Sequence, residues 1–360
     1  MKEGWQTKTL GDVCHVYQPE TISQKQVKAE EFRVYGANGQ IGWHNEFNHD
    51  SPQLILGCRG SCGTVHVTEP RSWINGNAMV VQPTNSAVDL AFLAYALKGG
   101  IELDDAITGT AQPQITRTSL MPLTISFPES LPEQQRIVAL LDEAFAGLAT
   151  AKTNAEQNLQ NAQAIFESHL ESVFSQRGEG WVETTLDKIS TNLDSRRVPI
   201  TKNVRSSGEY PYYGASGIVD YVADYIFEGD NLLVSEDGAN LLARSTPIAF
   251  SVNGRYWVNN HAHILHFESM ATQRFVEFYL ESIKLDEFIT GAAQPKLNQR
   301  ALNAIPIPIP ESIEEQARIV NGVESLQEET QRLTRLYERK LAALEELKKS
   351  LLHQAFNGEL

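Results

Sequence analysis

The densest group of basic side chains in this sequence lies in one short stretch of its second half. Its members are Arg196, Arg197, Lys202 and Arg205. Such a loop suits contact with phosphate, because arginine binds phosphate oxygens through paired hydrogen bonds and lysine binds them as a point charge. A sparser group in the first half comprises Lys25, Lys28 and Arg33. The alternative for both groups is an ordinary solvated loop.

Motifs for covalent or cofactor chemistry are missing from the sequence. It contains no G-x-x-x-x-G-K-[ST] phosphate loop, no G-x-G-x-x-G, no G-x-S-x-G and no H-E-x-x-H. It also has no Pro-Pro pair, and so lacks the Asn-Pro-Pro-aromatic or Asp-Pro-Pro-aromatic signature of amino-methyltransferases. We therefore expect a protein without catalytic residues or a bound cofactor.

Two small groups could in principle hold a metal ion. Cys58 and Cys62 are four residues apart, but no histidine cluster stands near them in the sequence. His261 and His263 would share one face of a strand, where a packed or hydrogen-bonded pair is the favoured interpretation. We expect no metal site.

Composition limits the class of protein and its partners. The net charge is -15, and acidic residues outnumber basic ones in both halves, so a nucleic-acid binder of this kind must rely on local basic groups and on partner proteins. No apolar run of about 18 residues predicts a membrane span, and the first residues lack the apolar stretch of a signal peptide. The three cysteines form no disulfide framework. These features favour a cytoplasmic protein that does not enter a membrane.

Internal repetition is the main signal in the sequence. Gly4-Trp5 returns as Gly180-Trp181, and the segment Tyr-Gly-Ala-Asn-Gly at 35–39 returns as Tyr-Gly-Ala-Ser-Gly at 213–217. A Thr-Gly-x-x-Gln-Pro motif occurs at 108–113 and again at 290–295, and the spacing of the two copies stays constant beyond it. The scaffold is therefore duplicated, whereas the interior of each copy has diverged.

A long helix is predicted after each copy. Ser130 with Glu133, and Ser312 with Glu315, fit the S-x-x-E capping box at a helix start. Apolar residues then recur three and four apart, a stripe along one helical face. The first stripe comprises Ile137, Leu141, Ala144, Leu148, Ala151, Ala155, Leu159, Ala162, Phe166, Leu170 and Val173. The second comprises Ile319, Val323, Leu326, Leu333, Tyr337, Leu341, Leu344, Leu352 and Ala355, interrupted by Thr330 and Lys348.

Each stripe needs a partner stripe, and the other repeat offers one. If each helix, roughly 43 residues or about 65 Å long, leads out of one domain toward the other, the two must be antiparallel. We therefore predict an α+β protein in which two mixed domains, related by a pseudo-two-fold axis, are separated by a pair of long coiled-coil helices. The predicted boundaries are 1–131 and 179–313 for the domains, and 132–178 and 314–360 for the helices.

Short elements are predicted inside each domain. The expected strands include 53–56, 78–81, 231–234 and 263–266, and the expected helices 90–98 and 272–284. The alternating prolines of 305–310 exclude an interior strand or helix and predict a stiff extended hinge.

The whole chain resembles the specificity (S) subunits of Type I DNA restriction–modification enzymes. The segments that carry the resemblance are 211–217 with its weaker twin 34–39, 236–241, 257–263, both Thr-Gly-x-x-Gln-Pro motifs, both Pro-Glu-Ser helix starts and 350–356. The first domain departs from the pattern, because Cys58-Arg59-Gly60 stands where the second has Glu236-Asp237-Gly238.

The resemblance implies a division of labour. Each domain would read one half of a split sequence in double-stranded DNA, and the helices would set the gap and dock methyltransferase subunits, two of them. Methylation and ATP-driven cleavage would belong to methyltransferase and restriction/translocase subunits, which makes this chain non-catalytic.

The resemblance also suggests residues that contact DNA. Arginine reads guanine and asparagine reads adenine, and residues beside turn glycines allow the backbone to approach DNA. Together with the two basic groups above, the candidates are Tyr35, Asn38, Arg59, Arg117, Tyr213, Ser216, Asn240, Arg244 and Arg300. Gln112 and Gln294 occur in both copies and are expected to support the fold. For each candidate the alternative is a structural hydrogen bond.

Two other functions remain open from the sequence. A self-contained methyltransferase is disfavoured by the missing motifs. A two-headed protein–protein scaffold without DNA readout is mildly favoured by the acidic charge.

Overall fold

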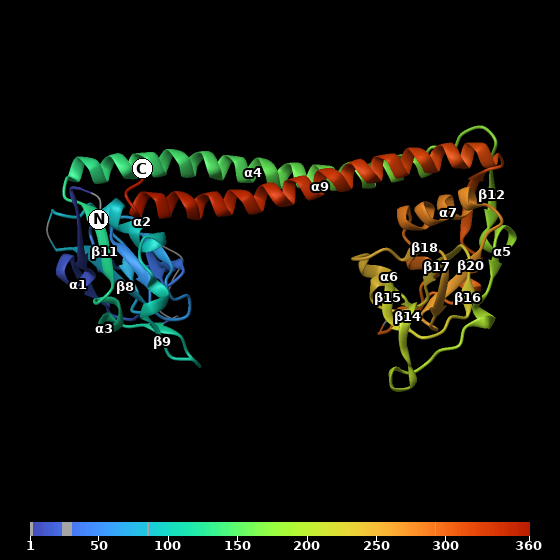
Figure 1. Cartoon of the computed structure of the whole chain (residues 1–360), viewed down its shortest axis with the longest axis horizontal. Helices are drawn as coiled ribbons and strands as arrows, with labels where there is room; N and C mark the ends of the chain where they lie inside the picture. The colour runs from blue at the N-terminus through green and yellow to red at the C-terminus, as the bar shows by residue number, and fades with distance from the viewer. Residues whose placement is uncertain (1–2, 24–30, 85, 292) are drawn as a thin grey trace. The chain divides into compact units, whose positions relative to one another are not determined.

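The computed structural model describes residues 3–23, 31–84, 86–291 and 293–360, and it divides the chain into two compact units (Figure 1). The first unit comprises 1–156 and 339–360, and the second comprises 157–338. Each unit mixes short strands with helices, which confirms the predicted α+β class. Each unit also takes in part of both long helices, so the helices are built into the domains at their ends.

The first unit is built around an antiparallel sheet of order β2-β8-β5-β6. A second sheet, β4-β3-β7, pairs β3 with β7 in parallel, and β1–β11 and β9–β10 form two-stranded sheets. The strands are β1 Trp5–Thr9, β2 Cys14–Tyr17, β3 Phe32–Gly36, β4 Gly39–His44, β5 Leu54–Gly57, β6 Val65–Val67, β7 Trp73–Ile74, β8 Ala78–Pro83, β9 Ile107–Thr108, β10 Gln114–Ile115 and β11 Thr124–Pro128. The short helices are α1 Leu10–Val13, α2 Leu90–Gly99 and α3 Arg117–Leu120.

The second unit repeats this strand order, except that one sheet gains the strand β16 and no sheet among the described residues corresponds to β9–β10. Its sheets are β13-β20-β17-β18, β15-β14-β19-β16 and β12-β21, again with one parallel pair, β14 and β19. The strands are β12 Trp181–Thr185, β13 Thr191–Asn192, β14 Ser207–Gly214, β15 Gly217–Val222, β16 Phe227–Glu228, β17 Asn231–Ser235, β18 Ala249–Val252, β19 Arg255–Val258, β20 Ala262–His266 and β21 Pro306–Pro310. The short helices are α5 Leu186–Ile189, α6 Asn240–Ala243, α7 Met270–Ser282 and α8 Gln299–Asn303. The matched topology confirms that the sequence repeat is a structural one.

The two long helices are α4, Leu131–Ser175, and α9, Ile313–Phe356. They pack together and run antiparallel (Figure 1). In the first unit, Lys152 Nζ binds Glu345 Oε1 at 2.8 Å across the pair. Of the two polar interruptions, Thr330 is buried with its hydroxyl donating to the Leu326 carbonyl of its own helix, whereas Lys348 is exposed. The other predicted stripe positions are buried or half-buried, which confirms the stripes.

The acidic residue of each predicted capping box also pairs with an arginine. Glu315 N donates to Ser312 Oγ at 3.2 Å, which is one half of the box. The Glu315 carboxylate forms a bidentate pair with Arg318, and Glu133 pairs with Arg136 in the same way. An arginine one turn along each helix competes for the carboxylate and forms the charge-assisted bonds.

An aromatic group anchors one end of a long helix in each unit. Phe356 at the end of α9 packs edge-on against Phe92, which also contacts Trp5. We call Trp5, Phe92 and Phe356 the first seat. In the second seat, Phe174 at the end of α4 packs against Phe275, which contacts Trp181.

Two glycines at the end of α2 let α9 approach in the first unit. A Cβ atom on Gly99 would lie 2.7 Å from Leu352 Cδ1, and one on Gly100 would lie 2.3 Å from the Phe356 ring. The last turns of α9 are therefore part of the first domain's core.

The proline run at 305–310 is more than a hinge. Residues Pro306–Pro310 form β21, which pairs antiparallel with β12 along its length. A two-stranded ladder needs donors only from alternate residues, so the prolines are tolerated and Ile307 and Ile309 face the core.

Among the described residues, no helix combines the length and apolar character needed to span a membrane.

Candidate nucleic-acid interface

Three segments of the second unit meet where β17 ends, at a place that we call the second junction. The Glu236 amide donates to the His261 carbonyl at 2.8 Å, and the Leu297 amide donates to the Glu236 carbonyl at 2.8 Å. Asp237 and Lys296 face each other in an isolated bridge. The side chains of His261 and Lys296 are about half exposed, and that of Asp237 is 20% exposed.

The same backbone arrangement recurs where β5 ends in the first unit, at the first junction. The Cys58 amide donates to the Asn77 carbonyl, and the Ile115 amide donates to the Cys58 carbonyl, both at 3.0 Å. Arg59 and Gln114 form the matching isolated bridge. One backbone frame therefore presents arginine, asparagine and glutamine in the first domain, and aspartate, histidine and lysine in the second.

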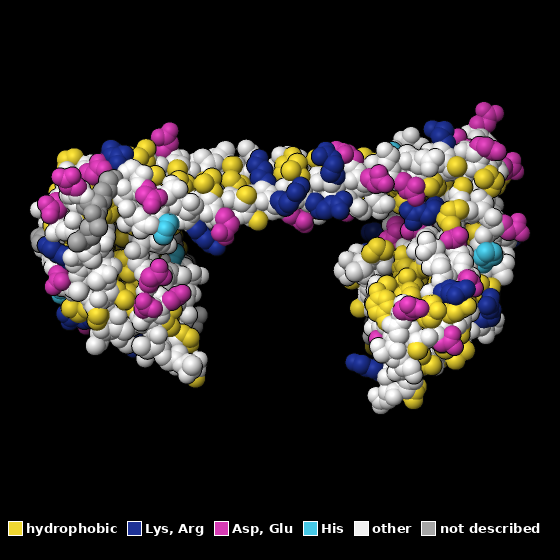
Figure 2. All heavy atoms as spheres, viewed as in Figure 1, with side chains coloured by type: hydrophobic (Ala, Val, Ile, Leu, Met, Phe, Trp, Pro, Cys, Tyr) yellow, Lys and Arg dark blue, Asp and Glu magenta, His cyan; other side chains and the backbone are white. Residues whose placement is uncertain are grey.

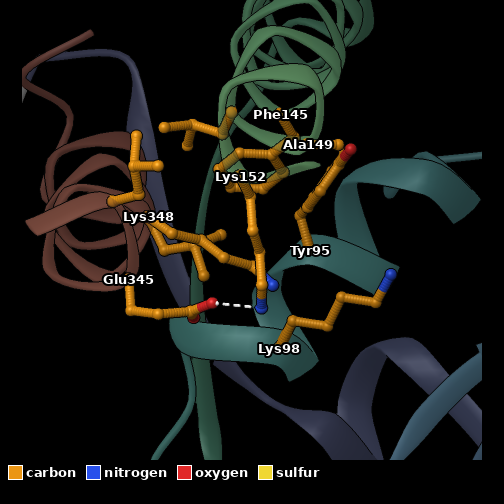
Figure 3. A pocket seen from close by; sticks show the side chains of 10 residues that line it. Tyr95, Lys98, Phe145, Ala149, Lys152, Glu345 and Lys348 are labelled. Carbon is orange, nitrogen blue, oxygen red and sulfur yellow. Dashed lines mark hydrogen bonds and ion pairs between the residues drawn. The ribbon is translucent and has the colours of Figure 1, made fainter. Parts of the chain in front are cut away.

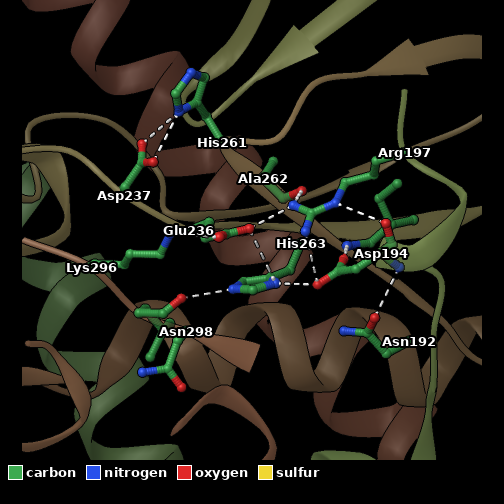
Figure 4. A network of polar contacts seen from close by, with 12 residues as sticks. Asn192, Asp194, Arg197, Glu236, Asp237, His261, Ala262, His263, Lys296 and Asn298 are labelled. Carbon is green, nitrogen blue, oxygen red and sulfur yellow. Dashed lines mark hydrogen bonds and ion pairs between the residues drawn. The ribbon is translucent and has the colours of Figure 1, made fainter. Parts of the chain in front are cut away.

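A network of ion pairs adjoins the second junction (Figure 4). Arg197 Nη1 lies 2.6 Å from Glu236 Oε2, and Lys296 Nζ lies 3.1 Å from the other oxygen of Glu236. His263 Nδ1 lies 2.5 Å from Asp194 Oδ2, and Arg197 also pairs with Asp194. The network fixes the backbone that carries the junction.

The carboxyl groups of this network titrate below their usual range. Burial raises the pKa of Asp194, but its hydrogen bond with His263 and the nearby charges outweigh burial and leave the pKa lowered. Burial likewise raises the pKa of Glu236, but Arg197, His263 and Lys296 outweigh burial and leave the pKa lowered.

Asp194, Glu236 and His263 place three ligand atoms within 4.8 Å of one another, a spacing that a metal ion could use. Arg197 and Lys296 already pair with the carboxylates, so the group is a satisfied ion-pair network. The hydrogen-bonded interpretation of His261 and His263 is confirmed, because His263 is buried between Asp194 and the Leu297 carbonyl and His261 binds Asp237.

The matched positions of the first domain are uncharged. Gln18 follows β2 as Asp194 follows β13, and Gln18 Nε2 donates to Cys58 Sγ at 3.1 Å and to the Gly76 carbonyl at 2.9 Å. Burial raises the pKa of the Cys58 thiol, and Met79, in the place of His263, is buried. The two junctions thus rest on different supporting chemistry.

The basic loop of the second domain splits into engaged and available residues. Arg197 is bound within the network, and Arg205 lies 3.1 Å from Asp220. Arg196 and Lys202 are exposed. The Arg196 guanidinium lies over the Phe227 ring and donates to the Ile226 carbonyl at 3.4 Å. Arg196 and Lys202 are therefore the members of this loop best placed for phosphate contact.

In the first domain, Lys25 and Lys28 lie outside the described residues. Arg33 is partly exposed and lies 3.5 Å from Glu69. Arg59 and Arg117 are exposed, as is Arg300 in the second domain. These arginines keep the accessibility that DNA contact requires.

The predicted polar and aromatic contacts differ in accessibility. Asn38 and Ser216 are exposed in the matched turns between β3 and β4 and between β14 and β15. Tyr213 is half-buried, and Tyr35 is 7% exposed with its hydroxyl accepting from the Glu69 amide. Tyr35 therefore supports the fold.

Asn240 and Arg244 also have internal partners. Asn240 Oδ1 accepts from the Thr246 amide at 3.0 Å. Arg244 donates to the carbonyls of Leu280 and Ile283 beside the end of α7. Both side chains hold a loop in place, which is the structural alternative for these positions.

The Thr-Gly-x-x-Gln-Pro motif forms a tight turn in both domains. Gly109 and Gly291 have φ values of 86° and 87°, and a Cβ on either would lie within 2.8 Å of the carbonyl of Gln112 or Gln294. The side chains of Gln112 and Gln294 are exposed, so their part in the fold is made by the backbone.

A hollow of about 430 Å³ lies in the first unit between α2, α4 and α9 (Figure 3). Phe145, Leu148 and other apolar residues form its walls. Lys98, Lys152 and Lys348 line it together with Glu345, which is paired with Lys152. Burial lowers the pKa of Lys98, and the charge of Lys348 lowers it further. The hollow thus concentrates positive charge beside apolar surface.

The visible face of the molecule carries acidic and basic side chains interspersed over both domains (Figure 2). This distribution agrees with the net charge of -15 and with local, rather than domain-wide, basic groups.

A family model described as "Type I restriction modification DNA specificity domain" matches residues 2–160 and again 178–345. The two matches cover most of both units. The chain belongs to this family. The specificity-subunit resemblance expected from the motifs is confirmed, with two such domains in tandem.

Two curated relatives of this family are similar over part of their length. A putative type I restriction enzyme specificity subunit of Haemophilus influenzae is 36% identical over 141 residues, which are 39% of this chain and 36% of the relative. The Type I restriction enzyme EcoprrI specificity subunit of Escherichia coli is 28% identical over 142 residues, 38% of this chain and 35% of the relative. The matches thus span about a third of each relative.

Two solved structures share the fold of this chain. A chain from a structure titled for complex assembly and conformational transition of the type I R-M system is similar with a TM-score of 0.79 at 15% identity, covering 100% of this chain and 99% of that one. The HsdS subunit from Thermoanaerobacter tengcongensis is similar with a TM-score of 0.63 at 16% identity, covering 100% and 98%.

The junctions were not recognised from the sequence. Of their six side chains only Arg59 was predicted to contact DNA, because the three segments of each junction recur at different spacings in the two copies. The signal available in the sequence was the difference between the two copies at these positions, where Cys58-Arg59 and Asn77 replace Glu236-Asp237 and His261.

Proposed function

We propose that this chain is the DNA-recognition subunit of a Type I restriction–modification complex, and that each domain reads one half of a bipartite sequence in double-stranded DNA. The observation that supports this most is the pair of junctions, where one backbone frame carries different hydrogen-bonding side chains in the two domains. Duplicated frames with different side chains suit two different half-sequences.

In this proposal the helices set the gap between the half-sequences and dock two methyltransferase subunits. Restriction/translocase subunits join through the complex, methylation and cleavage belong to these partners, and the assembly is cytoplasmic. The antiparallel pairing of α4 and α9 supports a spacer, and the lysine-lined hollow beside it offers a basic and apolar docking place.

An electrophoretic mobility-shift assay tests the proposal. We expect the lone chain to bind DNA weakly, because its charge of -15 opposes a polyanion, and the complex with methyltransferase subunits to bind one bipartite sequence. Sequence-specific nanomolar binding by the lone chain at physiological salt would overturn the expected dependence on partners.

The alternative is a two-headed protein–protein scaffold, which the acidic surface mildly favours. The same assay separates the two functions, because a scaffold would leave the complex without any sequence preference on DNA.

A further inference from the structure

We propose that the side chains presented by the two junctions form base-reading sites, one for each half-sequence. They are Arg59, Asn77 and Gln114 in the first domain and Asp237, His261 and Lys296 in the second. The inference rests on the proposed function and deepens it by naming where bases are contacted.

The backbone at each junction is already paired, so its side chains can change at little cost to the fold. The amides of Cys58 and Ile115 have carbonyl partners, as do those of Glu236 and Leu297. Side chains on such a frame are free to serve a ligand. Arg59 in the first domain and Asp237 in the second occupy the same position but carry opposite charges. Packing of the fold does not require such a reversal.

The first junction carries the chemistry of purine recognition. A guanidinium such as that of Arg59 can donate two bonds to guanine, and the amides of Asn77 and Gln114 can pair with adenine. Arg59 is exposed, and Gln114 and Asn77 are half-buried.

Two polar atoms beside the first junction have unused hydrogen-bonding capacity. Asn77 Oδ1 and His66 Nε2 are buried and have no hydrogen-bond partner among the described residues. They flank the turn between β3 and β4, because Asn77 lies against Gly36 and His66 against Gly39. An unpaired buried polar atom costs stability, which a bound hydrogen-bonding ligand would recover.

The second junction carries different hydrogen-bonding groups from the first. The Asp237 carboxylate can accept from the amino group of cytosine, and His261 Nδ1, 2.8 Å from Asp237 Oδ1, orients it. Lys296 pairs with Glu236 through one contact and remains half exposed, so its ammonium can also donate to guanine. The two domains should therefore prefer different bases.

The test uses the full chain in complex with its methyltransferase subunits. Methylation rates are measured on a duplex carrying the wild-type site and on duplexes with each base pair of either half substituted. Arg59→Asp places the second domain's residue in the first junction. Lys8→Asp, the same charge change on an exposed residue of β1, is the matched control.

We expect Arg59→Asp to lower the rate on the wild-type site by at least about tenfold and to change base preference at one or more positions of the first half. Preference in the second half should stay as in the wild type. Lys296→Gln should give the converse pattern, and Lys8→Asp should retain both preferences.

Unchanged preference in both halves for Arg59→Asp and Lys296→Gln would overturn the inference, as would an equal effect of Lys8→Asp. If Arg59→Asp lowers the melting temperature, the base preference of Gln114→Lys is used as the test in its place. Gln114→Lys keeps the backbone bridge and also places the second domain's residue in the first junction. A wild-type complex without any bipartite preference would instead overturn the proposed function itself.

Discussion

At the scale of single residues, the second domain holds buried charge where the first holds none. The side chains of Asp194 and Glu236 are 7% and 12% exposed, and each is paired with cationic or hydrogen-bonding groups. Removing one partner from a buried ion pair is costly, because the remaining charges lose their compensation.

We expect Asp194→Asn to destabilise the second domain by about 3 kcal/mol. The variant leaves Arg197 and His263 facing a neutral amide. Hydrogen exchange should show faster exchange of β17 and β20 amides, with β5 and β8 unchanged. Gln18→Ala, at the matched uncharged position, is the control, with an expected cost of about 1 kcal/mol confined to the first domain. Equal effects of the two changes would contradict a role for charge.

The same variant should alter the response to acid. The folded-state pKa values of Asp194 and Glu236 lie below their ordinary values of 3.8 and 4.5. Their stabilisation is therefore present above these ordinary values and is lost as the pH falls through the lower folded values. Below about pH 4, β17 and β20 should lose protection in the wild type, and Asp194→Asn should reduce this dependence.

The types of the residues and their neighbours in sequence predicted only part of the candidate site. Exposed positions beside turns, such as Asn38 and Ser216, followed from the sequence because turn glycines mark them. The engagement of Arg197 with Glu236, and the burial of Tyr35, depend on contacts between residues distant in sequence. Composition alone does not encode those contacts.

At the scale of elements, the aromatic seats attach the ends of the long helices to the domains. Phe356 is 8% exposed and Phe174 is 7% exposed, and both pack against an aromatic ring of the domain.

Phe356→Ala should destabilise the first domain by about 3 kcal/mol, because it leaves a cavity beside Phe92. Phe174→Ala should do the same to the second. Hydrogen exchange of α2 and α7 distinguishes the two, since each variant serves as the control for the other. Loss of protection in both domains with either variant would mean that the seats do not act separately.

The helix pair should act as a spacer. Inserting four residues after Ala155 and four after Tyr337 adds about 6 Å to each helix near the border between the units. With a rise of about 3.4 Å per base pair, methylation mapping should show a gap wider by about one to two base pairs and unchanged half-sequences. Insertion in α4 alone, the control, should impair assembly. An altered half-sequence with an unaltered gap would exclude the spacer role.

The periodicity of the sequence predicted the long helices better than it predicted how elements pair and pack with one another. The stripes fixed both long helices because a three-to-four spacing persists over many turns. The pairing of β21 with β12 was missed, since alternating prolines obscure an edge strand. The docking of α9 on Gly99 and Gly100 needs residues from both ends of the chain, which local patterns do not connect.

At the scale of the whole molecule, the long helix of each repeat ends in the hydrophobic core of the other repeat's domain. The core of the first unit takes Leu352 and Phe356 from α9. The core of the second unit takes Leu170 and Phe174, the same residue types at the matched positions, from α4.

Residues 1–178 alone should therefore form a homodimer, with Phe174 of each copy replacing Phe356 in the seat of the other. The small alanines of the α4 stripe bury little area, so the dimer should be weaker than the natural fusion. Sedimentation should show a dimer, and methylation should fall on an inverted repeat of the first half-sequence. The 1–178 fragment with Phe174→Ala is the control and should be monomeric. A wild-type fragment that stays monomeric would contradict the equivalence of the helices.

The most direct test of the account is to map methylated bases by long-read sequencing in cells that express the methyltransferase subunits with this chain, without it, or with its domains exchanged. We predict one bipartite methylated sequence that depends on the chain. In the predicted pseudo-two-fold arrangement, exchange of residues 5–128 with 181–310 should leave this duplex sequence unchanged, because the exchanged chain is equivalent to the natural one turned end for end on the DNA. Methylation of the same sequence without this chain, or a different bipartite sequence after the exchange, would contradict the account.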